Sequence, residues 1–129
     1  ADVCILDLVG GTADFIKIGG APSFLRRENK VEIIRQDALP IGILEEVQLE
    51  NISAPIQDED RIVMVTDGIL DAFAVMGDRE RALADFIATL NTINPQEIAD
   101  SVMEEALLQT DGVAKDDMTV LVGRIWTPC

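Results

Sequence analysis

The stretch that decides the fold is Ile62-Val63-Met64-Val65-Thr66-Asp67-Gly68, an apolar run that stops at an aspartate and a glycine. Its apolar residues do not alternate with polar ones, so residues 61–66 are predicted to form a strand that is buried on both faces. Asp-Gly is a common turn dipeptide, and the strand is expected to end there. Residues 69–75 then predict a short helix.

Two longer helices are predicted after this point. The first covers residues 79–90, where apolar residues recur at helical spacing. The second opens at Asn94-Pro95, with proline at the first helical position, and closes at Asp111-Gly112. Residues 118–125 are again apolar and predict a last strand, also expected to be buried.

Short runs with strand character fill the part of the chain before the deciding segment. They lie at residues 3–8, 12–18, 23–27, 31–35 and around 47–52. The first two flank Gly10-Gly11, and the next two flank residues 28–30, so each pair predicts an antiparallel hairpin. Residues 39–44 contain proline and glycine and are expected to form a loop. Strands, then helices, then one strand predict a single α+β domain over residues 1–129, with helices outside mostly antiparallel sheets.

Composition excludes several functional classes. The 129 residues carry 10 Lys+Arg and 24 Asp+Glu, and the net charge of −14 disfavours nucleic acid and anionic lipid as partners. There is no histidine, which removes Ser-His-Asp catalysis and histidine-based zinc sites. No apolar run reaches the length of a membrane span. Cys4 and Cys129 lack metal-ligand spacing, Cys4 is expected to be a buried thiol, and a reducing cytoplasm is the expected location.

Two aspartates stand where strands end and begin. Asp67 follows the strand at 61–66, and Asp116 precedes the strand at 118–125. If those strands are antiparallel neighbours, the two carboxylates meet at one sheet edge, where a hard cation such as Mg²⁺ or Mn²⁺ would relieve their repulsion. The residue types alone leave a plainer alternative open, because Asp67-Gly68 also suits a simple turn and Asp116-Asp117 a solvated loop.

Motif order adds a resemblance. Asp67-Gly68 after an apolar strand, a helix pair, and then Asp116-Asp117-Met118-Thr119-Val120 resembles the PPM/PP2C-type metal-dependent serine/threonine phosphatases. The stretches at residues 17–24 and 39–44 resemble the stage II sporulation protein E branch of that family. The resemblance implies a β-sandwich core of two facing sheets with helices outside.

The resemblance also implies roles for individual residues. Asp67 and Asp116 match aspartates that ligate Mn²⁺ or Mg²⁺ in a binuclear centre, which activates a water for attack on phosphoserine. Asp117 and Gly68 are expected to support that centre, through hydrogen bonds and through a sharp backbone turn respectively. The implied substrate is a small phosphorylated regulatory protein of the anti-anti-sigma factor type.

One family motif is absent from this sequence. The family carries an upstream Asp-Gly-Met-Gly motif that supplies a further metal ligand, and no such motif occurs here. The chain is therefore expected to be the C-terminal part of the domain, inactive alone, and to associate with itself or with the missing half. The parent protein could be membrane-anchored. A non-catalytic phosphatase-like interaction module is the alternative function, whereas a haloacid-dehalogenase-like hydrolase lacks its Asp-x-Asp signature.

Overall fold

The computed structural model describes residues 2–7, 9–17, 21–34, 50–110 and 117–126. The elements follow one another in the order β1 (Asp2–Asp7), β2 (Thr12–Lys17), β3 (Ser23–Arg27), β4 (Lys30–Ile34), β5 (Glu50–Pro55), β6 (Arg61–Val65), α1 (Asp67–Ala72), a 3₁₀ turn η1 (Phe73–Met76), α2 (Arg79–Thr89), α3 (Pro95–Gln109) and β7 (Val120–Arg124).

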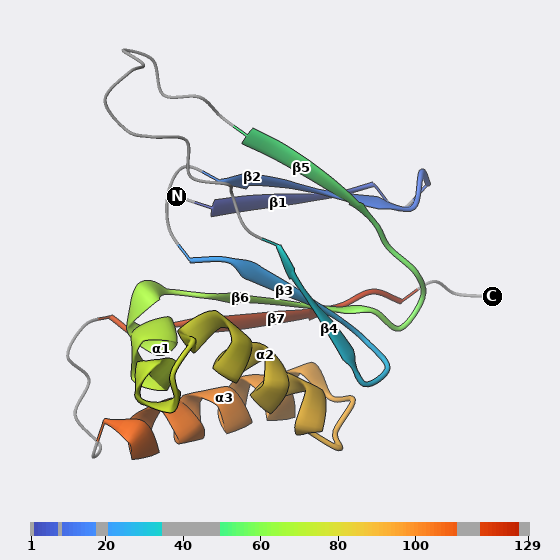
Figure 1. Ribbon diagram of the computed structural model, residues 1–129. Helices are drawn as coiled ribbons and strands as arrows, with labels where there is room; N and C mark the ends of the chain where they lie inside the picture. The colour runs from blue at the N-terminus through green and yellow to red at the C-terminus, as the bar shows by residue number, and fades with distance from the viewer. Residues whose placement is uncertain (1, 8, 18–20, 35–49, 111–116, 127–129) are drawn as a thin grey trace, which may run out of the picture.

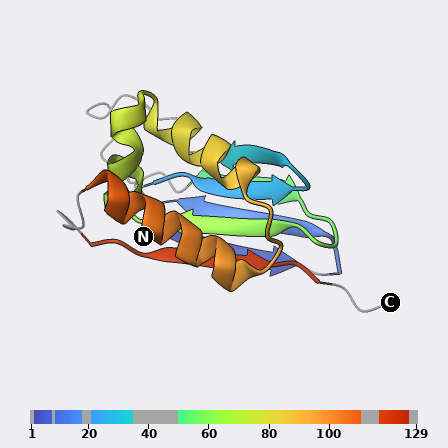
Figure 2. The same ribbon diagram turned by 90° about the horizontal axis from the view of Figure 1, so that it is seen from below.

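The strands form two facing antiparallel sheets, and the helices cover the outer side of one of them (Figure 1). One sheet has the order β1-β2-β5 and the other the order β4-β3-β6-β7. Seen from below, the helices lie across the second sheet, with α3 along β7 (Figure 2). The predicted α+β class, with antiparallel sheets and helices outside, is confirmed.

Both predicted hairpins are present. β1 pairs with β2 so that Asp7 lies opposite Thr12, and β3 pairs with β4 so that Arg27 lies opposite Lys30. The first turn is fixed by Asp7, whose carboxylate accepts hydrogen bonds from the backbone N–H groups of Val9 and Gly10 at 3.1 and 2.8 Å. This is the aspartate-to-backbone bonding that favours turns.

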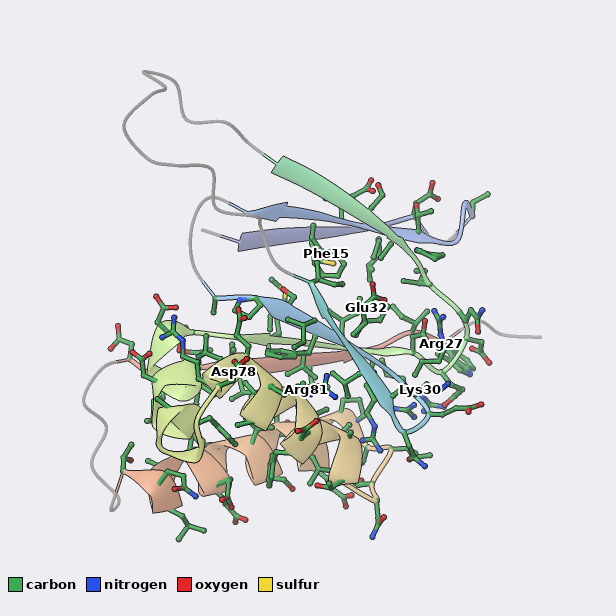
Figure 3. The ribbon with its side chains drawn as sticks, in the orientation of Figure 1. Phe15, Arg27, Lys30, Glu32, Asp78 and Arg81 are labelled. Atoms are coloured by element: carbon green, nitrogen blue, oxygen red, sulfur yellow. The ribbon has the colours of Figure 1, made fainter. Side chains whose placement is uncertain are left out.

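The β6 strand explains why the deciding segment is continuously apolar. Its side chains alternate between two cores: Val63 and Val65 pack under the helices, whereas Ile62 packs between the two sheets. Phe15 of β2 lies in the same inter-sheet core (Figure 3). A strand that lies between two apolar layers needs apolar residues on both faces, so the prediction for residues 61–66 is confirmed for β6.

Three predictions need correction. β7 is not a buried strand, because it lies at the edge of its sheet and only one of its faces packs on α3; Leu121 on the other face is 63% exposed. The helix expected at residues 69–75 begins earlier, at Asp67, and tightens into the 3₁₀ turn. Cys4 is half-buried rather than buried, because β1 is also an edge strand. The loop expected at residues 39–44, and Cys129, lie outside the described residues.

Two buried arginines attach the helices to the sheet. Arg26 and Arg61 face each other across β3 and β6, and each is only 5% exposed. Arg26 donates to the backbone carbonyls of Leu90 and Thr92, the latter at 3.1 Å, and Arg61 donates to that of Ile93 at 2.9 Å. Burial and the neighbouring Arg61 lower the pKa of Arg26. The guanidinium groups therefore fix the α2–α3 connection.

An ion pair with one buried partner closes the same end of the molecule. The side chain of Asp60 is 1% exposed and pairs with Arg27 at 2.7 Å. The hydrogen bond to Asp60 raises the pKa of Arg27. Arg27 and Lys30 both lie near the β3–β4 hairpin (Figure 3), at the opposite end of β6 from Asp67.

Candidate metal centre

The end of β6 and the start of β7 lie at one edge of the sheet. The two strands pair in antiparallel fashion, with Val65 opposite Val120. The premise behind the predicted Asp67–Asp116 site is therefore confirmed, since the residues that follow β6 and those that precede β7 must meet.

Thr66 joins the two segments beyond the last strand pair. Its backbone N–H donates to the carbonyl of Thr119 at 3.1 Å. Its hydroxyl donates to the carbonyl of Asp117 at 2.9 Å and accepts the backbone N–H of Thr119, also at 2.9 Å. The sequence predicts Thr66 only as the last residue of the strand at 61–66, and the one signal for a further role is its place directly before Asp67-Gly68.

Asp67 is the first residue of α1 and its side chain is exposed. Its carboxylate makes no hydrogen bond or ion pair with the residues that the structure describes. Gly68 is buried inside the first turn of α1 and does not adopt a positive φ angle. A role for Gly68 in the turn away from this edge stays a prediction. The turn from β6 into α1 passes through Thr66, whose backbone is extended (φ −87°, ψ 165°).

The partner aspartates differ in how far they can be placed. Asp117 is exposed and its carbonyl is held by Thr66. Asp116 lies outside the described residues. Within the described ranges no three Cys, Asp or Glu side chains are grouped to hold a metal ion. The donors at this edge are carboxylate oxygens, which suit Mn²⁺ and Mg²⁺, so the chemistry of the donor set fits these ions while a complete ligand set needs further groups.

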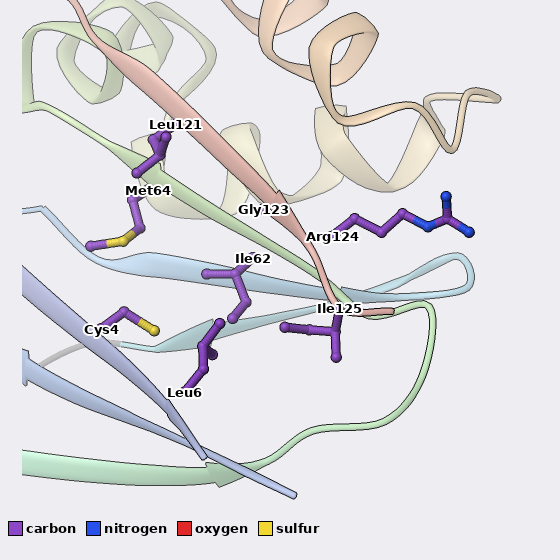
Figure 4. A pocket seen from close by; sticks show the side chains of 8 residues that line it. All are labelled: Cys4, Leu6, Ile62, Met64, Leu121, Gly123, Arg124 and Ile125. Atoms are coloured by element: carbon purple, nitrogen blue, oxygen red, sulfur yellow. The ribbon is translucent and has the colours of Figure 1, made fainter. Parts of the chain in front are cut away.

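A second feature lies between the two sheets. An apolar cavity of about 440 Å³ opens between β1 and the edge strand β7 (Figure 4). Its lining residues are Cys4, Leu6, Ile62, Met64, Leu121, Gly123, Arg124 and Ile125. In Figure 4 the Arg124 side chain extends away from this apolar group. Among the described residues, no strand pairs with the outer edge of β1 or of β7. We call this open side of the sandwich, between β1 and β7, the apolar mouth.

Within the described ranges, no helix combines the length and apolar character that crossing a membrane requires.

Comparison with known proteins gives one consistent result. The family model "Stage II sporulation protein E (SpoIIE)" matches residues 1–126. Stage II sporulation protein E of Priestia megaterium is 36% identical over 124 residues, which is 96% of this chain and 21% of that protein. The chain thus spans about a fifth of the length of this curated relative.

Solved structures agree with that match. The phosphatase domain of the cell fate determinant SpoIIE from Bacillus subtilis, presoaked with Mn, superposes with a TM-score of 0.87 at 33% identity, over 100% of this chain and 58% of that one. A structure of the PP2C phosphatase domain of the same protein, with a fragment of its regulatory domain, gives a TM-score of 0.86 at 36% identity, over 97% of this chain and 36% of that one. This chain belongs to the stage II sporulation protein E family and has the fold of part of its PP2C phosphatase domain.

Proposed function

We propose that this chain is the C-terminal, metal-binding part of a PP2C-type serine/threonine phosphatase domain. The observation that supports this most directly is the Thr66 bridge, which holds the segment before β7 beside Thr66, the residue that precedes the exposed Asp67. An enzyme of this type needs no histidine, and the chain contains none.

The proposed metal ligands are Asp67 and Asp116, on the two segments that meet at this edge. Asp117 would support the site, since its backbone is fixed by Thr66, and buried Gly68 would seat the start of α1 behind Asp67. Two Mn²⁺ or Mg²⁺ ions, when bound in the intact domain, supply a water of lowered pKa and polarise the phosphoryl oxygens. Asp67 would hold its carboxylate toward solvent, where a phosphoprotein can approach.

The proposed substrate is phosphoserine on a small regulatory protein of the anti-anti-sigma factor type, in the cytoplasm. Family membership supports this choice. The net charge of −14 disfavours nucleic acid as an alternative.

The proposed partner for the apolar mouth is the part of the domain that this chain does not cover. The related domain is longer, since this chain covers 58% of it. The cavity is lined by apolar side chains, among them Ile62 and Met64. On either side of it lie the edge strands β1 and β7, whose outer backbone groups pair with no other strand among the described residues. Strands added there would bury Leu121, and self-association through the same edges is expected when they are absent.

The experiment measures phosphate release from a phosphoserine protein by the intact domain, with and without MnCl₂. Asp67→Ala and Asp116→Ala are expected to abolish Mn²⁺-dependent release, whereas Asp85→Ala, an exposed aspartate on α2, should leave it unchanged. The 129-residue chain alone should show no turnover. Full activity in either metal-ligand variant would overturn the assignment, and an intact domain that binds no Mn²⁺ would instead favour a non-catalytic module.

A further inference from the structure

We propose that Thr66 is a positioning residue whose hydroxyl holds residues 117–119, the segment before β7, beside the start of α1 at Asp67. This inference rests on the proposed metal site, because it concerns how two of its segments are held. It adds a role for a side chain outside the proposed set of metal ligands.

The hydrogen bonds of Thr66 cross from one segment to the other. Its hydroxyl both donates and accepts a hydrogen bond with the segment before β7. It donates to the carbonyl of Asp117 and accepts the N–H of Thr119, each at 2.9 Å. A hydroxyl is the smallest side-chain group that can donate and accept at once. These two bonds extend the connection between the segments past the last β6–β7 pair, Val65 and Val120.

The position of Thr66 makes this use of the hydroxyl unusual. Thr66 occupies the N-cap position of α1, where a threonine oxygen ordinarily accepts a hydrogen bond from the first turn of the helix. Here the side chain makes no such bond. The Thr66 carbonyl accepts the N–H groups of Ile69 and Leu70 at 3.1 and 3.3 Å, as the carbonyl of an N-cap residue ordinarily does. The hydroxyl is thus directed to the segment that leads to β7.

The consequence for the site is geometric. Asp67 follows Thr66 directly, and Asp116 directly precedes the residue whose carbonyl Thr66 holds. Removing the hydroxyl takes away both of its bonds to this segment, whereas the backbone bond from Thr66 to Thr119 stays. Groups that orient metal ligands contribute about 10- to 100-fold to metal affinity, so we expect Thr66→Val to weaken Mn²⁺ binding by about 10-fold or more.

The test uses the intact domain and two readouts. MnCl₂ affinity is measured by titration calorimetry, and the exchange rate of the Thr119 amide hydrogen is measured by NMR without metal. Thr66→Val and Thr66→Ala should weaken Mn²⁺ binding and accelerate exchange at Thr119, whereas Thr66→Ser should restore both. The matched control is Thr89→Val, because the Thr89 hydroxyl donates within α2, to the carbonyl of Phe86, and bonds to no other described residue.

The outcomes separate this inference from the proposed function. Unchanged Mn²⁺ affinity in a folded Thr66→Ala or Thr66→Val domain overturns the positioning role, whether or not Thr119 exchanges faster. The same result follows if Thr66→Ser binds Mn²⁺ as weakly as Thr66→Val. If Asp67→Ala binds Mn²⁺ as wild type does, the metal site itself is refuted, which is the failure of the proposed function.

Discussion

The buried Asp60 carboxylate gives the sharpest test of how this fold is held together. It accepts the Nε and Nη2 groups of Arg27 at 3.0 and 2.7 Å and the backbone N–H of Gln57 at 2.7 Å. Asp60→Ala removes all of these bonds. Breaking a fully buried ion pair costs about 3–5 kcal/mol, because the surviving charge stays out of water.

Arg27 reduces that cost, because its side chain remains 39% exposed and water can solvate it after the substitution. What remains is the loss of charge-assisted hydrogen bonds and a small void at Asp60. We therefore expect Asp60→Ala to lower the free energy of unfolding by about 2 kcal/mol. For an intact domain of roughly 150–250 residues, this corresponds to a decrease in Tm of about 4–8 °C.

The assay is urea unfolding of the intact domain, with Asp85→Ala as the matched control. Both variants lose one negative charge, but Asp85 belongs to an exposed pair with Arg81, with side-chain exposures of 64% and 69%. Such a pair contributes about 0.3–0.5 kcal/mol. Equal destabilisation by the two variants would show that the burial of Asp60 does not matter, and the reasoning would be refuted.

Other predictions concern charge, packing and the open mouth. The hydrogen bond from Arg124 lowers the pKa of Glu59 below its ordinary value of 4.5, so the stability that Glu59 adds is present above pH 4.5 and is lost as pH falls through the lowered pKa. The stability difference between wild type and Glu59→Gln, from urea unfolding, should therefore shrink with acidification; a constant difference would contradict this. Ile98→Ala, at a fully buried position, should cost about 3 kcal/mol in the same assay, whereas Leu108→Ala, at a position that is 72% exposed, should cost about 0.5 kcal/mol or less. Leu121→Lys should reduce self-association of the isolated chain in sedimentation velocity; an unchanged association state would argue against the β7 edge as the contact.

Much of the fold could be predicted because its local signals agree. The continuous run at residues 61–65 marked the strand that lies between two apolar layers, and Asn94-Pro95 marked the start of α3. The exposure of one face of β7 could not be predicted, because an apolar run has the same sequence pattern in a central strand and in an edge strand. Leu121 faces an open mouth only because of where β7 lies in the sheet order, which is a property of the whole fold.

The candidate site divides in a similar way. Asp67 and its closeness to the start of β7 followed from the strand pairing, and the structure confirms that pairing. The Thr66 bridge could not be predicted, since a threonine hydroxyl at a strand end can cap a helix, face solvent or cross to a neighbour. Strand register alone decides among these choices. The roles of Asp67 and Asp116 as metal ligands stay predictions.

Among the described residues, the core under the helices is larger than the core between the two sheets, and this has a consequence for how the molecule opens. Among the described residues, the core under the helices contains 14 buried residues and the inter-sheet core contains eight. Regions with less buried apolar surface open more readily in sub-global fluctuations. We therefore expect the β1-β2-β5 layer to detach as a unit while β6 and β7 remain packed against the helices. The edge that carries Asp67 would then persist through excursions that expose half of the sandwich to water.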